Sequence, residues 1–101
     1  MTNQAINTEE QELHKRLVNG DETVIERLVE INEPMILSIA NQFTNQGLTQ
    51  SELIEAGTTG FVKCAKSEIG NTGRERYFRF VSWWVKQEIQ KLIVDKTSNN
   101  I

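Results

Sequence analysis

Apolar residues recur at helical spacing along almost the whole chain. The clearest case is residues 22–32, where Val24, Ile25, Leu28 and Val29 fall on one side of a helix. The same pattern predicts five helices, over residues 8–18, 22–32, 34–46, 50–66 and 77–93. No stretch alternates apolar and polar residues at period two for long enough to form a strand. The sequence therefore predicts an all-α fold, a compact bundle of about four to five helices.

Helix-start and helix-stop residues separate these segments. Asp21 suits an N-cap, Pro34 suits the first turn of the third helix, and Thr49 with Glu52 forms a capping box before the fourth helix. Residues 67–73 are rich in turn formers and are expected to be a loop. We expect a disordered N-terminus over residues 1–7, a single helical domain over 8–95, and a C-terminal tail over 96–101.

The last predicted helix carries more aromatic residues than a core helix needs. Residues 77–84 hold five of the seven aromatic residues of the chain, with basic residues and amides close by. On a helical projection, the sector expected to face the core contains Phe78, Val81, Val85, Ile89, Leu92 and Ile93. The opposite sector and its flanks are expected to form a ligand surface of Tyr77, Arg79, Phe80, Trp83, Trp84, Lys86, Gln87, Gln90 and Lys91. Spare rings beside cations favour stacking on unpaired bases next to phosphate contacts, whereas the alternative is that the tryptophans pack under neighbouring helices.

Composition and charge narrow the class of partner. With 101 residues, of which 38% are hydrophobic and 25% charged, the chain is one globular domain by size. It has no run apolar enough for a signal peptide or a membrane span, so we expect a cytoplasmic protein without a membrane partner. Residues 1–62 hold three basic and ten acidic residues, a net charge of −7, whereas residues 63–101 hold eight basic and four acidic ones, a net charge of +4. Since only the second half suits an anionic partner, we expect the chain alone to bind DNA weakly, through a local contact that is conditional.

Groups with reactive chemistry are sparse. The single cysteine, Cys64, and the single histidine, His14, exclude a disulfide within the chain and a metal site of ordinary ligand count. Cys64 lies among apolar residues and is expected to be a buried, inert thiol, whereas His14 is expected on a solvated helix face. No pair of potential catalytic groups has a spacing that indicates an active site, so we expect no enzyme activity and no cofactor. Gly57 and Gly60 interrupt the fourth helix, which indicates that another helix packs closely there.

Three stretches stand in a fixed order along the chain. Residues 36–48 contain ILSIA and FTNQGL, residues 52–63 read ELIEAGTTGFVK, and residues 80–89 read FVSWWVKQEI. Together they resemble region 2 of bacterial RNA polymerase sigma factors of the housekeeping type: its first conserved helix, its core-binding segment and its promoter-melting and promoter-reading helix. The resemblance begins at about Leu28. It implies a non-enzymatic domain that binds core RNA polymerase and recognises and melts the minus-ten promoter element.

The resemblance also implies roles for individual residues. In that family the core-binding segment docks on the clamp helices of the largest polymerase subunit, and the matching positions are Glu52, Glu55, Thr58 and Val62. The aromatic helix holds the single-stranded non-template strand. In this chain Tyr77, Phe80, Trp83 and Trp84 match its stacking surfaces and wedge, Gln87 and Gln90 match the positions facing the upstream base pair of the element, and Arg79, Lys86 and Lys91 would hold phosphates.

Some features depart from the family pattern. Ala56 stands where a second acidic residue is usual, and Ile69 replaces a phenylalanine that helps to line the pocket for the flipped base, so the promoter preference is expected to differ from the housekeeping consensus. Residues 96–101 are expected to lead toward downstream domains that this chain lacks, as an excised domain or as a short factor. The alternative function is an interaction module that binds polymerase, or an anti-sigma protein, through the acidic first half without reading DNA.

Overall fold

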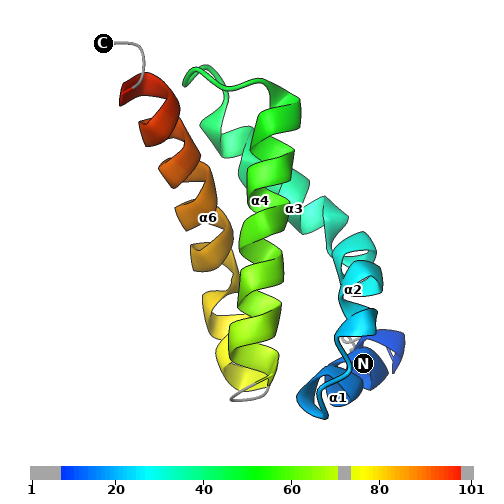
Figure 1. Ribbon diagram of the computed structural model, residues 1–101. Coiled ribbons are helices and arrows are strands. Elements are labelled where there is room, and N and C mark those ends of the chain that lie inside the picture. The colour runs from blue at the N-terminus through cyan, green and yellow to red at the C-terminus, as the bar shows by residue number, and fades with distance from the viewer. Residues whose placement is uncertain (1–7, 71–73, 99–101) are drawn as a thin grey trace.

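The computed structural model describes residues 8–70 and 74–98, and these residues form an all-α bundle (Figure 1). The α-helices are α1 (Thr8–Val18), α2 (Ile25–Ile31), α3 (Glu33–Ala40), α4 (Gln50–Cys64) and α6 (Arg74–Ser98). The 3₁₀ turns η1 (Glu22–Val24) and η2 (Asn41–Phe43) and the π-helical turn η3 (Ala65–Ile69) extend or connect them. The all-α prediction is confirmed, while the expectation of disorder over residues 1–7 lies outside the described residues.

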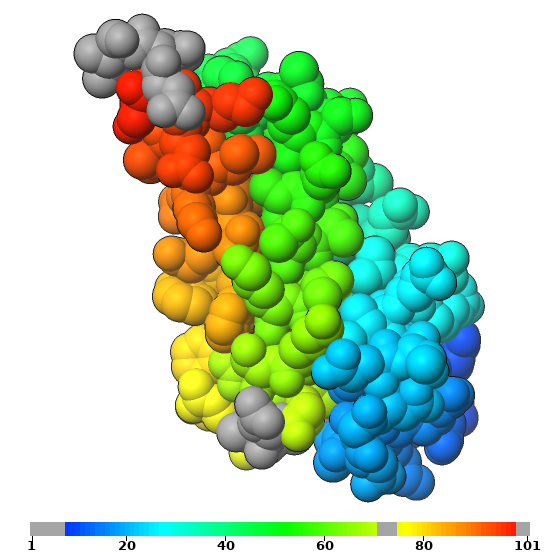
Figure 2. Space-filling view, in the orientation of Figure 1, coloured from blue at the N-terminus to red at the C-terminus, as the bar shows by residue number. Residues whose placement is uncertain are grey.

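Helices α4 and α6 run side by side in opposite directions and form the most extensive helix pair of the bundle, with α6 at its edge (Figures 1 and 2). Their close approach depends on Gly60, where a Cβ atom would lie 2.5 Å from the backbone oxygen of Trp84 and 2.8 Å from the Cα of Val85. At Gly57 a Cβ atom would lie 3.1 Å from the side chain of Ile36 on α3. The expectation of close helix packing at this glycine pair is therefore confirmed.

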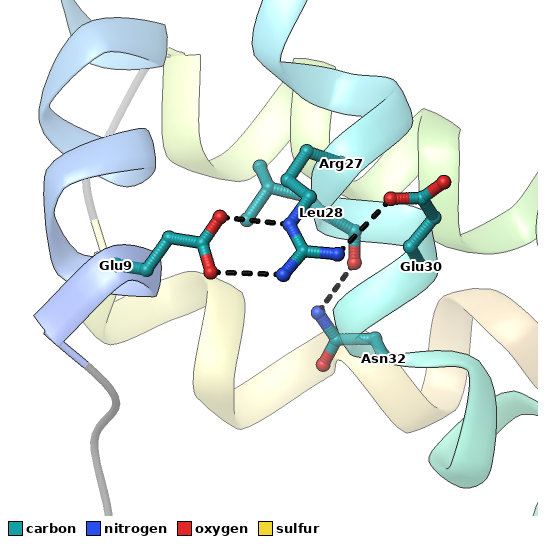
Figure 3. Close-up of polar contacts among 5 residues, drawn as sticks. All are labelled: Glu9, Arg27, Leu28, Glu30 and Asn32. Carbon is teal, nitrogen blue, oxygen red and sulfur yellow. Dashed lines mark hydrogen bonds and ion pairs between the residues drawn. The ribbon is translucent and has the colours of Figure 1, made fainter.

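Helices α2 and α3 pack against α4, α3 also contacts α6, and α1 packs against α2 and η3 (Figure 1). Polar contacts fix α1 against α2: the Arg27 guanidinium donates to both oxygens of Glu9, at 2.7 and 3.0 Å, and to Glu30 at 3.1 Å (Figure 3). The pKa of the Glu9 carboxyl is held below its usual value, chiefly by the hydrogen bond from Arg27. At the end of α2, the Asn32 amide donates to the Leu28 carbonyl at 2.8 Å (Figure 3).

The expected helix starts are present, and two of the expected helix ends lie elsewhere. Asp21 accepts a hydrogen bond from the Thr23 amide, Pro34 lies in the first turn of α3, and the capping box of Thr49 and Glu52 is complete. The third helix is shorter than predicted, because α3 ends at Ala40 and η2 ends at Phe43 before a turn with positive φ at residues 45 and 47. The last helix is longer than predicted and ends at residue 98.

The loop predicted from Ser67 is wrong for residues 67–69. These residues continue α4 as the π-helical turn η3, which buries Glu68 and Ile69. The wide turn is stabilised by contacts distant in sequence, since Glu68 accepts hydrogen bonds from Arg76 and Trp84 of α6. Local turn propensity is overridden by this tertiary contact.

His14 and Cys64 are both fully buried, which matches the expectation for the cysteine only. The imidazole of His14 lies edge-on to the ring of Tyr77, with centroids 5.0 Å apart, and its Nε2 lies 3.9 Å from a Glu10 oxygen. The predicted solvated face is wrong because His14 shares the inner side of α1 with Leu13 and Leu17. Burial raises the pKa of the Cys64 thiol to about 12, which agrees with an inert thiol.

Candidate nucleic-acid interface

The side of α6 that faces away from α4 is polar, aromatic and exposed. Trp83 has 53% of its surface exposed, and Arg79, Gln87, Gln90 and Lys91 are also exposed. Phe80, Trp84 and Lys86 lie at the edges of this surface and are partly exposed. We call these eight residues the outer face of α6. All eight are at least partly exposed, Lys91 also lines a groove with α4, and the contact of these residues with DNA stays a prediction.

Tyr77 does not belong to the outer face, and its predicted exposure is wrong. It is only 1% exposed and fills the space between His14 and Phe61, whose rings lie 5.0 and 6.1 Å away. Burial raises the pKa of its phenol above the usual value. Phe78, which was expected in the core, is 48% exposed instead. Tyr77 precedes Val81 by four residues, and this spacing could have placed it with the core sector.

A small pocket opens where the N-terminal half of α6 meets η3. Its cavity volume is about 190 Å³, and its walls are Glu68, Arg76, Phe80, Trp83 and Trp84. The Arg76 guanidinium lies over the Phe80 ring, 4.7 Å from the centroid, and the two indoles meet edge to face with centroids 5.7 Å apart. Three aromatic side chains and a guanidinium therefore surround one opening, which suits a flat aromatic guest.

Glu68 is one wall of this pocket and holds two of the other walls in place by hydrogen bonds. One carboxylate oxygen accepts from Arg76 Nε at 3.0 Å, and the other accepts from Trp84 Nε1 at 3.1 Å. The hydrogen bond from Arg76, followed by the one from Trp84, holds the pKa of the Glu68 carboxyl below its usual value, so the group is ionised at neutral pH. Glu68 thus fixes the direction of one indole and one guanidinium.

Sequence reasoning missed Glu68 and Arg76 and misplaced Ile69. Ile69 is fully buried in the core and is not a wall of the pocket, whereas its neighbour Glu68 is. Ile69 offers no exposed aliphatic surface in this structure, and the expected difference in promoter preference stays a prediction. Little in the sequence indicated either role, since Glu68 is one of two acidic residues between Lys66 and Arg76.

Charge on α6 is divided between its two sides. Glu88 is the only acidic residue between Arg79 and Val94, and its carboxylate pairs with Lys63 of α4 at 2.7 Å. The next acidic residue, Asp95, lines a groove between α6 and α4. The side chains of Glu88 and Asp95 therefore face α4, and the outer face keeps its positive charge.

The residues predicted to bind polymerase lie along α4 in different settings. Glu55 is exposed, whereas Thr58 and Val62 are partly exposed. Glu52 closes the capping box with the Thr49 amide at 2.9 Å and pairs with Lys96 of α6 at 2.7 Å. The hydrogen bond from Lys96 is the largest cause of a lowered pKa at Glu52.

A second groove brings the two predicted sets of residues together. Its volume is about 380 Å³, and its walls are Glu55, Ala56, Thr59, Glu88, Lys91, Leu92 and Asp95. Glu55 of the α4 set and Lys91 of the α6 set thus share one groove. Thr59 is a surface residue of this groove that sequence reasoning did not single out.

Two further kinds of site are not found in the described part of the chain. No helix there combines the length and the apolar content that crossing a membrane requires. Within residues 8–70 and 74–98, no three histidine, cysteine, aspartate or glutamate side chains gather in a way that could hold a metal ion.

Comparison with known proteins gives a consistent set of relatives. The chain is 34% identical over 88 residues to the RNA polymerase sigma factor SigA of a Bacillus species, and the match covers 87% of this chain. It is 30% identical over 88 residues to the RNA polymerase sigma factor SigA of Clostridium acetobutylicum. In both cases the match spans only 23% of the relative. No protein-family model matches the chain.

Proposed function

The chain carries a sigma factor region of the housekeeping type, and on this premise we propose that it binds core RNA polymerase and opens and reads the minus-ten promoter element. In this proposal α4 supplies the docking surface for the clamp helices of the largest polymerase subunit. The outer face of α6 holds the single-stranded non-template strand. The protein acts in transcription initiation as a binding module and not as an enzyme.

The observation that carries the DNA role is the pocket of Glu68, Arg76, Phe80, Trp83 and Trp84. A base that leaves the duplex loses stacking worth a few kcal/mol, and aromatic walls can replace that stacking. Glu68 partly neutralises the positive charge of Arg76. The guanidinium therefore offers N–H donors in fixed directions at the pocket, with little net charge for non-specific attraction. Trp83, one wall of the pocket, is exposed enough to act as a wedge against the last closed base pair.

The distribution of charge supports the same proposal. Gln87 and Gln90 are exposed and follow the pocket by one and two helical turns, where they can donate to and accept from an adenine edge. Lys86 precedes Gln87 directly, Arg79 lies about two turns before it, and both suit phosphate contacts. Lys91 is a weaker phosphate ligand in this structure, because it shares its groove with Glu55, Glu88 and Asp95.

Docking on polymerase through α4 is supported most directly by Glu55, which is exposed, and by Thr58 and Val62 beside it. Glu52 differs from them because its carboxylate is already engaged by the Thr49 amide and by Lys96. We therefore assign the main charged contact with polymerase to Glu55 and a mainly structural role to Glu52.

A pull-down with core polymerase, followed by crosslinking to a forked promoter fragment, tests the proposal. The chain is expected to be retained by core polymerase and to crosslink to the non-template strand of the minus-ten element. Trp83→Ala should keep the retention and lose the crosslink. Phe78→Ala is the matched control, because Phe78 is a similarly exposed aromatic residue outside the outer face. Equal crosslinking by wild type and Trp83→Ala would remove the DNA role.

The alternative is an interaction module that docks on polymerase, or on an anti-sigma protein, without reading DNA. The groove between α4 and α6 favours it, since three carboxylates line this groove against one lysine. Under this alternative, Glu55→Lys abolishes function while Lys86→Glu and Gln87→Ala leave it intact. A loss of function from the two outer-face changes as large as that from Glu55→Lys would reject the alternative.

A further inference from the structure

Val94 is a large apolar side chain left in solvent near the end of α6, with 59% of its surface exposed. It follows Gln90 by four residues and Gln87 by seven, so the three side chains lie along the same side of the helix. Its neighbours turn elsewhere: Asp95 lines the groove with α4, and Lys96 pairs with α4. Val94 therefore continues the outer face of α6 by one further turn.

We infer that Val94 contacts the methyl group of a thymine in the duplex just upstream of the minus-ten element. The inference rests on the proposed function, in which Gln87 and Gln90 face the upstream base pair of the element. An aliphatic side chain cannot hydrogen-bond to a base edge, and the C5 methyl group of thymine is the apolar group that the major groove presents. A valine at this position therefore selects thymine by an apolar contact.

The length of one helical turn sets the position of that thymine. Val94 lies about 6 Å further along the helix axis than Gln90, at about 1.5 Å per residue. Successive base pairs are about 3.4 Å apart along the duplex. The contacted thymine is therefore at the first or second base pair upstream of the pair that Gln87 and Gln90 face.

The polar and charged side chains around Val94 favour a nucleic-acid partner over a protein partner. An exposed valine alone is common and needs no explanation. Here, however, the valine extends a surface on which Arg79, Lys86 and two glutamines are exposed or partly exposed. Of the two nearby carboxylates, Glu88 pairs with Lys63 and Asp95 lines the groove with α4. A partner that continues along this surface past Gln90 is anionic, and within duplex DNA only the thymine methyl offers an apolar match.

Deoxyuridine tests the inference, because it differs from thymidine only by the methyl group. Fork probes carry thymine, on either strand, at the first and second upstream base pairs, and each thymine is replaced in turn by uracil. Binding is measured with the full chain and core polymerase. At one of these positions the uracil probe is expected to bind about three- to fourfold more weakly, as for the loss of one buried methyl group. Val94→Ser should bring the ratio to about one, and Val94→Ile should preserve it.

Val18→Ser is the matched control, since Val18 of α1 is 49% exposed and distant from α6 in sequence. It should leave the thymine-to-uracil ratio unchanged. If wild type binds the probes well but does not distinguish thymine from uracil at any tested position, the inference fails and the proposed function stands. The inference also fails if Val94→Ser keeps the wild-type ratio. If no probe binds in the presence of core polymerase, the proposed function fails and this inference with it.

Discussion

The two adjacent tryptophans have different physical roles although they follow each other in sequence. Trp84 is partly buried against the core and donates its indole N–H to Glu68, whereas Trp83 is 53% exposed and touches mainly Trp84. Trp84→Ala should therefore cost about 2 kcal/mol or more in the free energy of unfolding. Trp83→Ala should change that free energy by less than about 0.5 kcal/mol.

Urea unfolding of the two variants measures this difference. For DNA binding, the effect of Trp83→Ala is expected to be the easier one to interpret. This substitution removes a stacking surface worth about 1–3 kcal/mol without disturbing the fold. Equal destabilisation by both substitutions would mean that Trp83 is packed and is not available as a wedge.

Glu68 makes the pocket sensitive to acid. Its pKa in the folded protein lies below the ordinary value of 4.5, so the ionised group stabilises the fold fully above that pH. The contribution is lost as the pH falls through the lowered pKa. Glu68→Gln keeps an acceptor for the Trp84 indole and removes the charge that Arg76 contacts.

The difference in unfolding free energy between wild type and Glu68→Gln should therefore be positive near neutral pH and shrink below pH 4.5. Other carboxyls with lowered pKa values, such as Glu9 and Asp21, are present in both proteins and cancel in this difference. A difference that does not change with pH would show that the charge on Glu68 contributes nothing to the fold.

At the scale of helices, the α4–α6 pair is the element on which the site depends. Gly60 allows the backbone of α4 to approach Trp84 and Val85 at the base of the outer face. Gly60→Ala would gain up to about 1 kcal/mol in helix propensity, but the new Cβ meets backbone atoms that cannot move aside. We expect a net loss of about 2–3 kcal/mol, as for an overpacked core.

Thermal and urea denaturation of Gly60→Ala and Gly70→Ala measure this effect. Gly70 is the matched control, because no atom lies within 4 Å of a Cβ built there. Gly70→Ala should equal wild type or exceed it by up to about 1 kcal/mol. A Gly60→Ala protein as stable as the Gly70→Ala protein would contradict the close packing of α4 on α6.

The helix starts, which the sequence predicts correctly, depend on interactions between residues close in sequence. The N-cap at Asp21, the helix start at Pro34 and the capping box at Thr49 each depend on residues within a few positions, and all three are present. The π-helical turn η3 was not predictable in this way, because residues 67–73 are rich in turn formers and the turn depends on contacts distant in sequence, chiefly those of Glu68 with α6. The pocket was missed for the same reason.

The prediction of which side of α6 Tyr77 and Phe78 occupy was also wrong, and this error has a different physical origin. The core sector of α6 is well marked by Val81, Val85 and Ile89, but its first turn carries two adjacent rings that fit either side. The ring that finds a cavity is Tyr77, because His14 of α1 and Phe61 of α4 leave a space there. That space is a property of the assembled bundle and cannot be read from one helix.

At the scale of the whole molecule, charge separates the two proposed contacts. The first 62 residues have a net charge of −7 and the remaining 39 have +4, so the protein as a whole repels DNA while the outer face of α6 attracts it. Binding to DNA by the chain alone should therefore be weak. Docking on polymerase would bring the outer face to the promoter and remove the need for unaided attraction.

Promoter opening is measured most directly with a promoter probe that carries 2-aminopurine in place of one adenine of the non-template strand of the minus-ten element. Its fluorescence rises when the base unstacks from its neighbours. We expect a rise with the chain and core polymerase together, none with either alone, and none when Trp83→Ala replaces the wild-type chain. The same rise with core polymerase alone, or with Trp83→Ala, would contradict the proposal that the outer face of α6 opens the promoter.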